Sequence, residues 1–458
     1  MSGSIAHYDV AYIGQALKNN ELSQVTLPAS SLTECRGEIG NFTLSYQAEE
    51  ELDQIQTSNI VINLPHQEEL PVEGCLSLTG VGEEFLAEAD GDKPLIIIQD
   101  YQELSAAALS QRGLKLALQA KSEDPAREVY YFYQAMRFMD NNDELYEEAR
   151  RQEVIFLKHD LGELEISQDG EIFYSREDIE LSLSGELVVA PELKPAAEVD
   201  RLARIFNITR GPEGYLQVDN IYLQPTLSGK RGLYVLGGAR GPNALTYQQE
   251  EREYTLQEVK RNLIGVEELD EEERSVDDQK CVVCYTCYRV CPHGAIQRDE
   301  ELNSMQIMPL ACQSCNLCIS RCPMGAITRS GEVEEQPQSD RQVIICENSA
   351  ALAREKADSD PMAGLEVTEV PCVSTVKKEH IYQRLAGSEG DLLILGCISE
   401  ACKHLTGHDR CEQVVSSAKS DLEKLDLDPE RVNYQRLSPR MAADLSAYLT
   451  DWKGEVLQ

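Results

Sequence analysis

The chain has 458 residues, and its 80 acidic and 42 basic side chains give a formal net charge of −38. A surface this acidic repels phosphate backbones, which argues against nucleic acid as a partner. The chain is also too long for one hydrophobic core, so about three domains are expected.

No apolar stretch approaches the roughly 18–20 residues that span a bilayer. The longest stretches are short, such as Pro94–Ile98 and Leu392–Ile398. The N-terminus shows no basic segment followed by an apolar one, the pattern of a secretory signal. We therefore expect a cytoplasmic protein without direct membrane insertion, which would meet a membrane only through another protein of its complex.

Residues 1–264 form a first block, which we predict to be a mixed α/β region. Its strands and helices alternate along the chain, an order typical of α/β folds. The elements expected in chain order are a strand at Leu95–Ile98, a helix at Glu103–Lys121, a strand at Glu128–Phe132, a helix at Asn142–Gln152, a strand at Val154–Leu157 and a helix at Pro195–Phe206.

An acidic linker, 267–278, leads to a second block at 279–328, which contains two similar runs of cysteines. Each run reads C-x2-C-x2-C-x3-C-P, and the runs begin at Cys281 and Cys312. This spacing is typical of a bacterial ferredoxin module with two [4Fe-4S] clusters. The repeat predicts two halves related by a pseudo-twofold axis.

In such modules the fourth cysteine of each run, which precedes a proline, ligates the cluster of the other run. Zinc would need four thiolates in two C-x2-C pairs rather than eight in this order. Disulfides conflict with the expected compartment. We therefore assign to cluster 1 Cys281, Cys284, Cys287 and Cys322, and to cluster 2 Cys312, Cys315, Cys318 and Cys291.

A polar linker at 329–342 precedes the third block, 343–454. The pattern of this block predicts a small parallel sheet with helices on its faces. Strands are expected at Gln342–Cys346, Leu365–Val370, Leu392–Leu395 and Val432–Tyr434, and helices at Ser349–Ala357, Val376–Ala386, Glu412–Leu425 and Pro439–Trp452.

Three of these strands deliver a cysteine at their carboxyl ends, the edge of a parallel sheet where ligands collect. Cys346, Cys372 and Cys397 follow the first three strands, and Cys402 lies in the loop beyond Cys397. Four converging thiolates suit a [2Fe-2S] cluster or a zinc ion, and ordinary buried cysteines would give the same pattern. Cys411, at the start of a helix, is interpreted as non-ligating.

The third block resembles the delta subunit of methyl-viologen-reducing hydrogenase. In that family a [2Fe-2S] cluster relays electrons between a hydrogenase or formate dehydrogenase and heterodisulfide reductase. The chain departs from the family at Ser349, where a C-x-x-C motif often closes, and at Lys403-His404, where His-Tyr is common. The residues that carry the resemblance are Cys346, Pro371-Cys372, Gly396–Cys402 (GCISEAC) and Leu427–Val432 (LDPERV).

The cysteine runs and much of the first block resemble the A subunit of heterodisulfide reductase, which is a flavoprotein. The matching stretches are Gly37–Thr43 (GEIGNFT), 219–222 (DNIY) and Gly232–Pro242 (GLYVLGGARGP). In the family the last of these closes over FAD. Joined to a hydrogenase-like tail, this architecture also resembles the B subunit of the quinone-interacting membrane-bound oxidoreductase.

A flavin site of this kind opens with a strand, the motif G-x-G-x-x-G and a helix whose N-terminus meets the pyrophosphate. The nearest match, at 80–85 (GVGEEF), places two carboxylates where phosphate would lie, so we reject it. The chain is expected to start after the dinucleotide-binding element of the family, and the ferredoxin insertion of the family is missing too. The first block is thus predicted to be a degenerate flavoprotein fold kept as scaffold. Alternatively FAD still binds, with its phosphates held partly by a partner and with Gly237, Gly238 and Gly241 at its site. Otherwise these glycines form a plain turn after a strand.

These features predict a non-catalytic iron–sulfur subunit of an oxidoreductase complex. Its expected partners are other subunits of a redox complex that is heterodisulfide reductase-like or linked to a hydrogenase, a formate dehydrogenase or a quinone. One alternative is an FAD-containing subunit that splits or merges electron pairs. Another is a structural adaptor whose C-terminal site holds zinc. Metal analysis separates these hypotheses, because the relay needs about ten irons.

Overall fold

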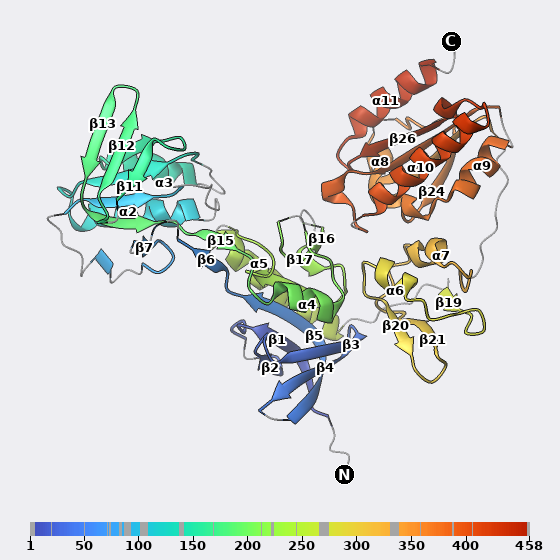
Figure 1. Ribbon diagram of the computed structural model, residues 1–458, viewed down its shortest axis with the longest axis horizontal. Coiled ribbons are helices and arrows are strands. Elements are labelled where there is room, and N and C mark those ends of the chain that lie inside the picture. The colour runs from blue at the N-terminus through green and yellow to red at the C-terminus, as the bar shows by residue number, and fades with distance from the viewer. Residues whose placement is uncertain are drawn as a thin grey trace.

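The structure is a computed structural model of the chain, shown in Figure 1. We distinguish a central unit, an outer unit, a cysteine module (274–329) and a tail (339–455). In Figure 1 the outer unit lies at the left, the central unit in the middle and the tail at the upper right, with the module below the tail. The residues described are 5–19, 21–49, 51–70, 72, 75–81, 85–86, 93–100, 109–136, 142–167, 169–211, 213–220, 224–243, 245–264, 274–329, 339–357, 359–386, 389–404 and 406–455.

The central unit is built on a sheet in the order β16-β17-β18-β5-β1-β2, in which β18, β5, β1 and β2 run parallel. Strands β3 and β4 extend it as an antiparallel hairpin on β5. Helices α4 and α5 pack on opposite faces, which explains the uninterrupted apolar run Ile60–Ile62. The bounds are β1 His7–Gly14, β2 Gln24–Leu27, β3 Leu32–Glu38, β4 Asn41–Ala48, β5 Glu51–Leu64, α4 Val199–Phe206, β16 Val218–Asn220, β17 Gln224–Ser228, β18 Leu233–Gly237 and α5 Leu245–Ile264.

The connection from β1 to the parallel strand β2 is short. Residues 15–23 return the chain to the start of β2, whereas a parallel crossover ordinarily takes about a dozen residues or more and includes a helix. The structure describes this connection except for residue 20. None of its described residues is helical. This crossover therefore offers no helix N-terminus among its described residues, the element that holds a pyrophosphate in dinucleotide-binding folds.

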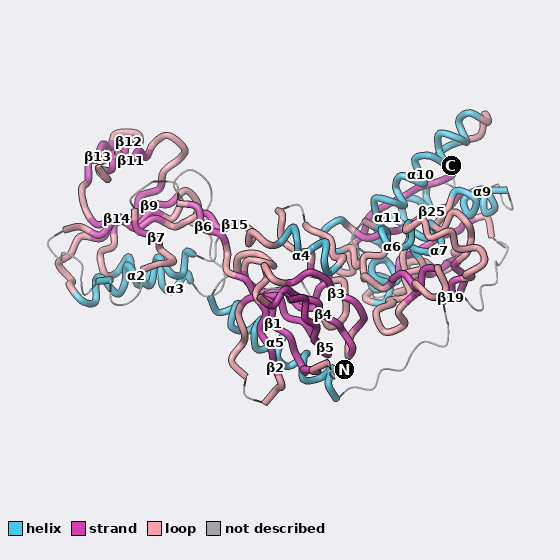
Figure 2. Tube along the Cα trace, turned by 60° about the horizontal axis from the view of Figure 1, so that its bottom comes forward, coloured by secondary structure: helices cyan, strands magenta, loops and turns pink. Residues whose placement is uncertain are grey.

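The outer unit is a second parallel sheet, in the order β10-β9-β8-β14-β7. Helices α2 and α3 cover one face, as Figure 2 shows, and a small antiparallel sheet, β11–β13, covers the other. Strands β6 and β15 pair where the chain passes between the two units. The bounds are β6 Gln67–Glu69, β7 Leu76–Ser77, β8 Leu95–Ile98, α2 Ser110–Glu123, β9 Val129–Tyr133, α3 Asn142–Arg151, β10 Ile155–Lys158, β11 Leu164–Ile166, β12 Ile172–Arg176, β13 Ile179–Leu183, β14 Glu186–Val189 and β15 Glu192–Lys194.

The predicted alternation of strands and helices is present in this unit, and the mixed α/β class is confirmed. The helix expected from Glu103 is described only from Ser110, and residues 101–108 lie outside the described part of the chain. The sheet β11–β13 was not predicted. Its strands carry exposed apolar side chains such as Phe173 and Ile179, which blur the two-residue alternation of a half-buried strand.

The cysteine module consists of two short helices and two pairs of antiparallel strands. Strand β19 pairs with β22, and β20 pairs with β21. The predicted linkers on either side fall largely outside the described residues. The bounds are β19 Arg274–Val276, α6 Thr286–Val290, β20 Ile296–Asp299, β21 Ser304–Ile307, α7 Leu317–Arg321 and β22 Ile327–Arg329.

The tail is the predicted parallel sheet, in the order β24-β23-β25-β26. Helices α9 and α10 pack on one face, and α8 and α11 pack on the other. Helix α10 begins at Gly407, five residues before the predicted start at Glu412. The bounds are β23 Arg341–Cys346, a π-turn at Glu347–Ala351, α8 Leu352–Glu355, β24 Glu366–Val370, α9 Lys378–Ala386, β25 Asp391–Cys397, α10 Gly407–Lys424, β26 Val432–Leu437 and α11 Ala442–Glu455, with single 3-10 turns at Val373–Thr375, Ser399–Ala401 and Pro429–Arg431.

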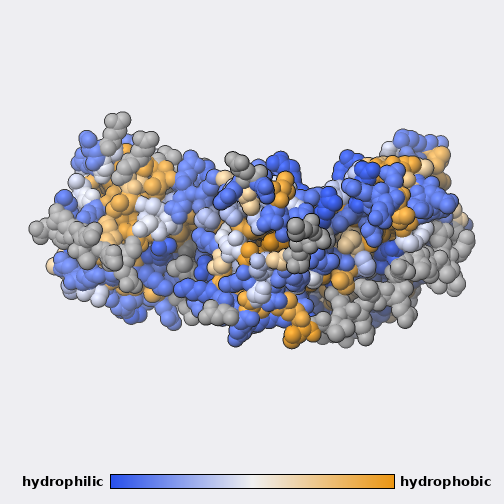
Figure 3. Space-filling view, turned by 90° about the horizontal axis from the view of Figure 1, so that it is seen from below, coloured by the Kyte–Doolittle hydropathy of each residue, from blue (hydrophilic) through white to orange (hydrophobic). Residues whose placement is uncertain are grey.

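The surface is mainly hydrophilic, as the face in Figure 3 shows, with hydrophobic patches scattered over it. In the part of the chain that the structure describes, no helix combines the length and the apolar character needed to cross a membrane.

Candidate metal centres

The two cysteine runs of the module have the same backbone conformation. Each run places two residues in the left-handed region, Val283 and Tyr285 in the first (φ of 51° and 58°) and Ser314 and Asn316 in the second (φ of 55° and 58°). Each run then continues into a five-residue helix, α6 or α7, that ends at its fourth cysteine. The sequence repeat is thus a repeat of structure.

This conformation forms two concave loops whose amides turn inward. Left-handed residues placed next to right-handed ones direct successive N–H groups toward a common point, an arrangement that binds anions. Val283 is β-branched and rarely adopts positive φ, so the loop is held in this form by its surroundings. The N–H groups of Ala295 and Ala326 also donate to the sulfurs of Cys291 and Cys322, at 3.4 and 3.3 Å. Such donors fit sulfur atoms that carry negative charge, as in iron–sulfur clusters.

The thiols of the first predicted cluster lie around one small cavity, which we call group 1. Three come from the first run and the fourth comes from the second, and apolar side chains such as Met305 and Ile327 complete the wall. Burial raises the pKa of Cys287 to about 11. The Thr286 hydroxyl lowers the pKa of Cys284 by hydrogen bonding to its sulfur. The members of group 1 are Cys281, Cys284, Cys287 and Cys322.

The other four thiols of the module form group 2. Cys315 and Cys318 are buried, and burial together with the neighbouring sulfurs of Cys291 and Cys312 raises their pKa values, that of Cys315 to about 12. Neutral thiols are thus favoured here until a cation compensates the charge. Group 1 thus combines three thiols of the first run with one of the second, and in group 2 Cys291 of the first run lies near thiols of the second. The assignment of these thiols to two clusters stays a prediction.

The tail thiols converge at the carboxyl edge of the sheet. Cys346 and Cys397 end β23 and β25, and their sulfurs lie 3.6 Å apart. Two thiolates bound to one tetrahedral ion at about 2.3 Å lie about 3.8 Å apart, so this distance fits a shared metal. Cys372 and Cys402 are buried in the adjoining loops. These four cysteines are called the tail group.

Protons are unevenly shared within the tail group. The Cys397 thiol donates hydrogen bonds to the sulfurs of Cys346 and Cys402, which lowers the pKa of both partners and raises that of Cys397. His408 lowers the pKa of Cys402 further, through its imidazole and its backbone N–H. Two of the four sulfurs are therefore disposed toward the thiolate form that metals bind.

The N-terminus of α10 lies directly on the tail group. A Cβ atom on Gly407 would lie 2.6 Å from the sulfur of Cys372 and 3.6 Å from that of Cys402. Only glycine permits this approach, which brings the positive end of the helix dipole to the thiolates. Residue-by-residue analysis of the sequence missed Gly407 and His408, because it placed the start of the helix five residues too late.

Ser349 and Cys411 complete the surroundings of the tail group. Ser349, where the resembling family often has cysteine, donates its hydroxyl hydrogen bond to the Leu437 carbonyl at 2.5 Å. Its oxygen is thus engaged with the backbone. Cys411 is fully buried in the same apolar cluster as Cys346, Cys397 and Cys402. Burial and the nearby thiols raise its pKa, and its interpretation as non-ligating remains a prediction.

Two of the three glycines considered for FAD, Gly237 and Gly238, have another use in the fold. A Cβ on Gly238 would lie 2.2 Å from the Pro65 carbonyl oxygen, and one on Gly237 would lie 2.5 Å from that of Leu64. These two glycines therefore accommodate the chain's own backbone, and the N–H of Gly238 donates to the Leu64 carbonyl. Together with the short crossover after β1, this arrangement does not fit a flavin phosphate. The plain-turn interpretation agrees with the geometry better than the FAD interpretation.

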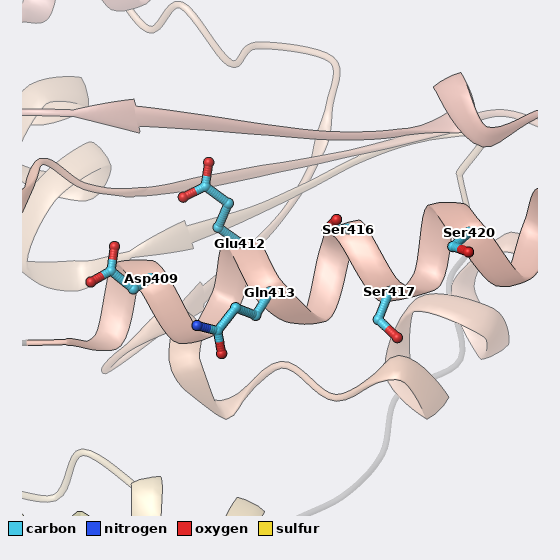
Figure 4. A pocket seen from close by; sticks show the side chains of 6 residues that line it. All are labelled: Asp409, Glu412, Gln413, Ser416, Ser417 and Ser420. Carbon is cyan, nitrogen blue, oxygen red and sulfur yellow. The ribbon is translucent and has the colours of Figure 1, made fainter.

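A larger hollow, of about 740 Å³, opens along the outer face of α10. Its lining is polar, with carboxylates such as Asp409 and Glu412 and the hydroxyl groups of Ser416 and Ser417, and Figure 4 shows these side chains along one side of the helix. No thiol is among its described lining residues. We therefore place the candidate chemistry at the three thiol groups.

Two parts of the chain match known protein families. Residues 274–343 match the family described as 4Fe-4S dicluster domain, and residues 342–458 match the family described as methyl-viologen-reducing hydrogenase, delta subunit. The chain is 23% identical to the A subunit of the ferredoxin:CoB-CoM heterodisulfide reductase of Methanosarcina mazei over 375 residues, which cover 75% of this chain and 46% of that protein. The chain thus spans about half the length of this curated relative.

Two further matches cover smaller parts of the chain. The iron-sulfur D subunit of the F420-non-reducing hydrogenase vhu of Methanopyrus kandleri is 33% identical over 76 residues, 17% of this chain and 58% of that protein. The flavoprotein disulfide reductase RclA of Escherichia coli aligns with a TM-score of 0.32 at 14% identity, covering 53% of this chain and 51% of the RclA chain. A TM-score this low supports no conclusion about shared function.

These findings define the protein as an iron–sulfur protein. More particularly, it joins a region similar to the A subunit of heterodisulfide reductase to a C-terminal domain of the hydrogenase delta-subunit type.

The close approach of α10 can be tested with Gly407→Val. The added side chain would collide with the sulfur of Cys372, so we expect the metal content of the tail to fall while that of the module is retained. The measurement is iron, zinc and acid-labile sulfide per chain. The matched control is Ser416→Val, which places the same β-branched residue at an exposed position of α10. Equal metal content in the two variants would contradict the assignment of this site.

The role of Gly238 can be tested with Gly238→Ala. The methyl group would meet the Pro65 backbone, which should destabilise the central unit by about 1–3 kcal/mol. We expect a lower Tm by calorimetry, and the same decrease whether or not FAD is added. A Tm of the unaltered protein that rises with FAD, and does not rise in the variant, would restore the flavin interpretation.

Proposed function

We propose that the chain is a non-catalytic subunit that relays electrons between partner subunits of a redox complex. Group 1 and group 2 would each hold a [4Fe-4S] cluster, and the tail group would hold a [2Fe-2S] cluster. The corresponding domains are 1–264, 279–328 and 343–454. Bound there, such clusters accept and pass on single electrons at potentials set by charge, hydrogen bonds and burial.

The observation that carries this proposal is the contiguity of the three thiol groups. Cys287 of group 1 and Cys318 of group 2 pack in one apolar cluster. Cys315 of group 2 and Cys372 of the tail group pack in another, together with Leu317. An unbroken series of buried sulfurs therefore extends from the module into the tail. A metal site with a purely structural role would not need buried sulfurs that continue from one thiol group to the next.

The chain's own groups prepare each site for negatively charged sulfur. The left-handed loops at 283–285 and 314–316 turn amides toward the module thiols, and α10 directs its N-terminus at the tail group. Arg410 lies close enough to Cys315 and Cys372 for both sulfurs to act on its pKa, which burial lowers. Its positive charge near both groups favours the more reduced, more negative state at their junction.

The partners are proposed from the relatives. The relatives are named as subunits of heterodisulfide reductase and of a hydrogenase, so we propose subunits of such complexes as electron donor and acceptor. A formate dehydrogenase or a quinone-linked protein would serve equally well. The strong net negative charge favours a partner with a basic docking surface.

A zinc-bearing adaptor is the second candidate function. The 3.6 Å separation of Cys346 and Cys397 suits a single tetrahedral ion as well as a binuclear cluster. In that case the module would keep its clusters and the tail would serve to dock another protein of the complex.

Metal analysis of anaerobically purified protein separates these two functions. The relay predicts about ten irons and eight to ten acid-labile sulfides per chain, with no zinc. The measurement is elemental analysis, combined with low-temperature magnetic resonance after dithionite reduction. About eight irons with one zinc would favour the adaptor, and absence of labile sulfide would refute both.

The interleaved assignment predicts which single cysteine variants resemble one another. Cys322→Ser should perturb the same resonance signal as Cys281→Ser, although these residues belong to different runs, because both thiols line the same cavity. Cys312→Ser should perturb the other signal. Cys35→Ser, which changes a thiol in β3 of the central unit, is the control and should leave both signals intact. A Cys322→Ser spectrum that matched Cys312→Ser instead would contradict the assignment.

A further inference from the structure

Two buried histidines join the module to the tail. His293 lies two residues after Cys291 of group 2, and His404 lies two residues after Cys402 of the tail group. Their side chains are 1% and 3% exposed. Nε2 of His293 lies 2.8 Å from Nδ1 of His404, and the rings meet edge to face with an interplanar angle of 88°.

The central unit contacts this pair on the side of His293. Nδ1 of His293 lies 2.8 Å from the carbonyl oxygen of Gly229, in the turn between β17 and β18. Because a carbonyl only accepts, Nδ1 of His293 donates, and Nε2 of the neutral ring accepts from Nδ1–H of His404. The His404 ring also lies within hydrogen-bonding reach of the Pro371 carbonyl. One continuous chain of hydrogen bonds therefore connects the central unit, the module and the tail.

The packing around the pair leaves little room for adjustment. A Cβ on Gly229 would lie 2.6 Å from the Pro292 carbonyl oxygen, so the turn rests directly on the segment that follows Cys291. On the other side of that segment, Gly294 has φ of 57°, and a Cβ there would lie 3.2 Å from the side chain of Lys230. The loop that carries His293 is thus packed against the central unit on both sides.

The junction lies next to the contact between group 2 and the tail group. The ligand atoms of His293, His404 and Cys315 all lie within 4.8 Å of one another, and Cys315 also packs with Cys372. Three such groups would suit a metal ion. Since Cys315 belongs to group 2 and the imidazoles already bond to each other and to Gly229, a positioning role agrees better with their contacts.

We propose that the hydrogen-bonded pair His293–His404, anchored on the Gly229 carbonyl, positions the tail group against group 2 and thereby sets the rate of electron transfer between them. The inference rests on the proposed relay function. One electron leaves the reduced group and enters the oxidised one, with no bond formed or broken at the histidines. Both histidines are positioning residues, because neither belongs to a thiol group.

The test compares His404→Leu with His404→Asn in the full chain loaded with its clusters. Leucine fills the space without a donor and leaves Nε2 of His293 unpaired, whereas the asparagine amide can donate from near the position of Nδ1. The matched control is His159→Leu, which removes a fully buried imidazole from the outer unit. The readouts are the magnetic interaction between the reduced groups, the rate at which the tail group is reduced after mixing with reduced methyl viologen, and small-angle scattering.

We expect His404→Leu to retain its iron, to lose the magnetic interaction and to slow the reduction of the tail group on the order of tenfold, since the rate between two positioned groups falls as they move apart. His404→Asn should restore the rate to within a few-fold, and His159→Leu should not change it. An unchanged rate and unchanged magnetic interaction in His404→Leu would overturn the inference.

Small-angle scattering tests the positioning role of the histidine pair independently of the proposed relay function. If the unaltered protein holds no [2Fe-2S] cluster, the relay fails, but the joint is still tested. A larger radius of gyration in His404→Leu than in His404→Asn and the unaltered protein supports a joint that holds the tail in place. Equal radii in all variants refute it. If His404→Leu also loses the iron of the tail, the comparison is repeated with His293→Leu, which breaks the same bond from the side of the module.

Discussion

Sulfur atoms that share a metal must lie within about 4 Å of one another, and this requirement explains the local folds of the module and the tail. The module has residues with positive φ and short helices in each run, and four of its sulfurs line the cavity of group 1. The tail meets this requirement with a parallel sheet, whose strand ends bring together residues from distant parts of the sequence. In both cases burial raises the pKa of several thiols, so their thiolate forms would be favoured only with a bound cation. Binding of a metal there would then be coupled to folding.

The two kinds of site differ in how far the sequence predicts them. In the module, the spacing of each run fixes the local geometry, and the repeat indicates which thiol crosses over. In the tail, short apolar runs and helical periods predicted the sheet, and strand ends indicated four of the thiols. The start of α10 was missed because Gly407 is a poor helix former, present where a side chain would collide with sulfur. Cys411 packs in the same apolar cluster as Cys346, Cys397 and Cys402, and its sequence position gave no indication of this.

Contacts between distant segments could not be predicted in this way. His293 and His404 are 111 residues apart, and nothing in either local sequence marks a partner. The hairpin β3–β4 and the sheet β11–β13 were missed as well, because periodicity describes one strand at a time and gives no information about its neighbours. The same limitation applies to the central unit. Its sequence resembles a flavoprotein, yet only the structure reveals that Gly237 and Gly238 contact the chain's own backbone.

The covalent link between module and tail has a consequence for how strong their contact must be. Only the short segment 330–338 separates the described parts of the two, so the tail is held near the module at an effective concentration in the millimolar range. A contact as small as two imidazoles and a few apolar side chains would let separate proteins dissociate readily. Within one polypeptide the same contact is re-formed each time it opens. Because the two parts belong to one polypeptide, the contact between them can be small and weak and still hold them together.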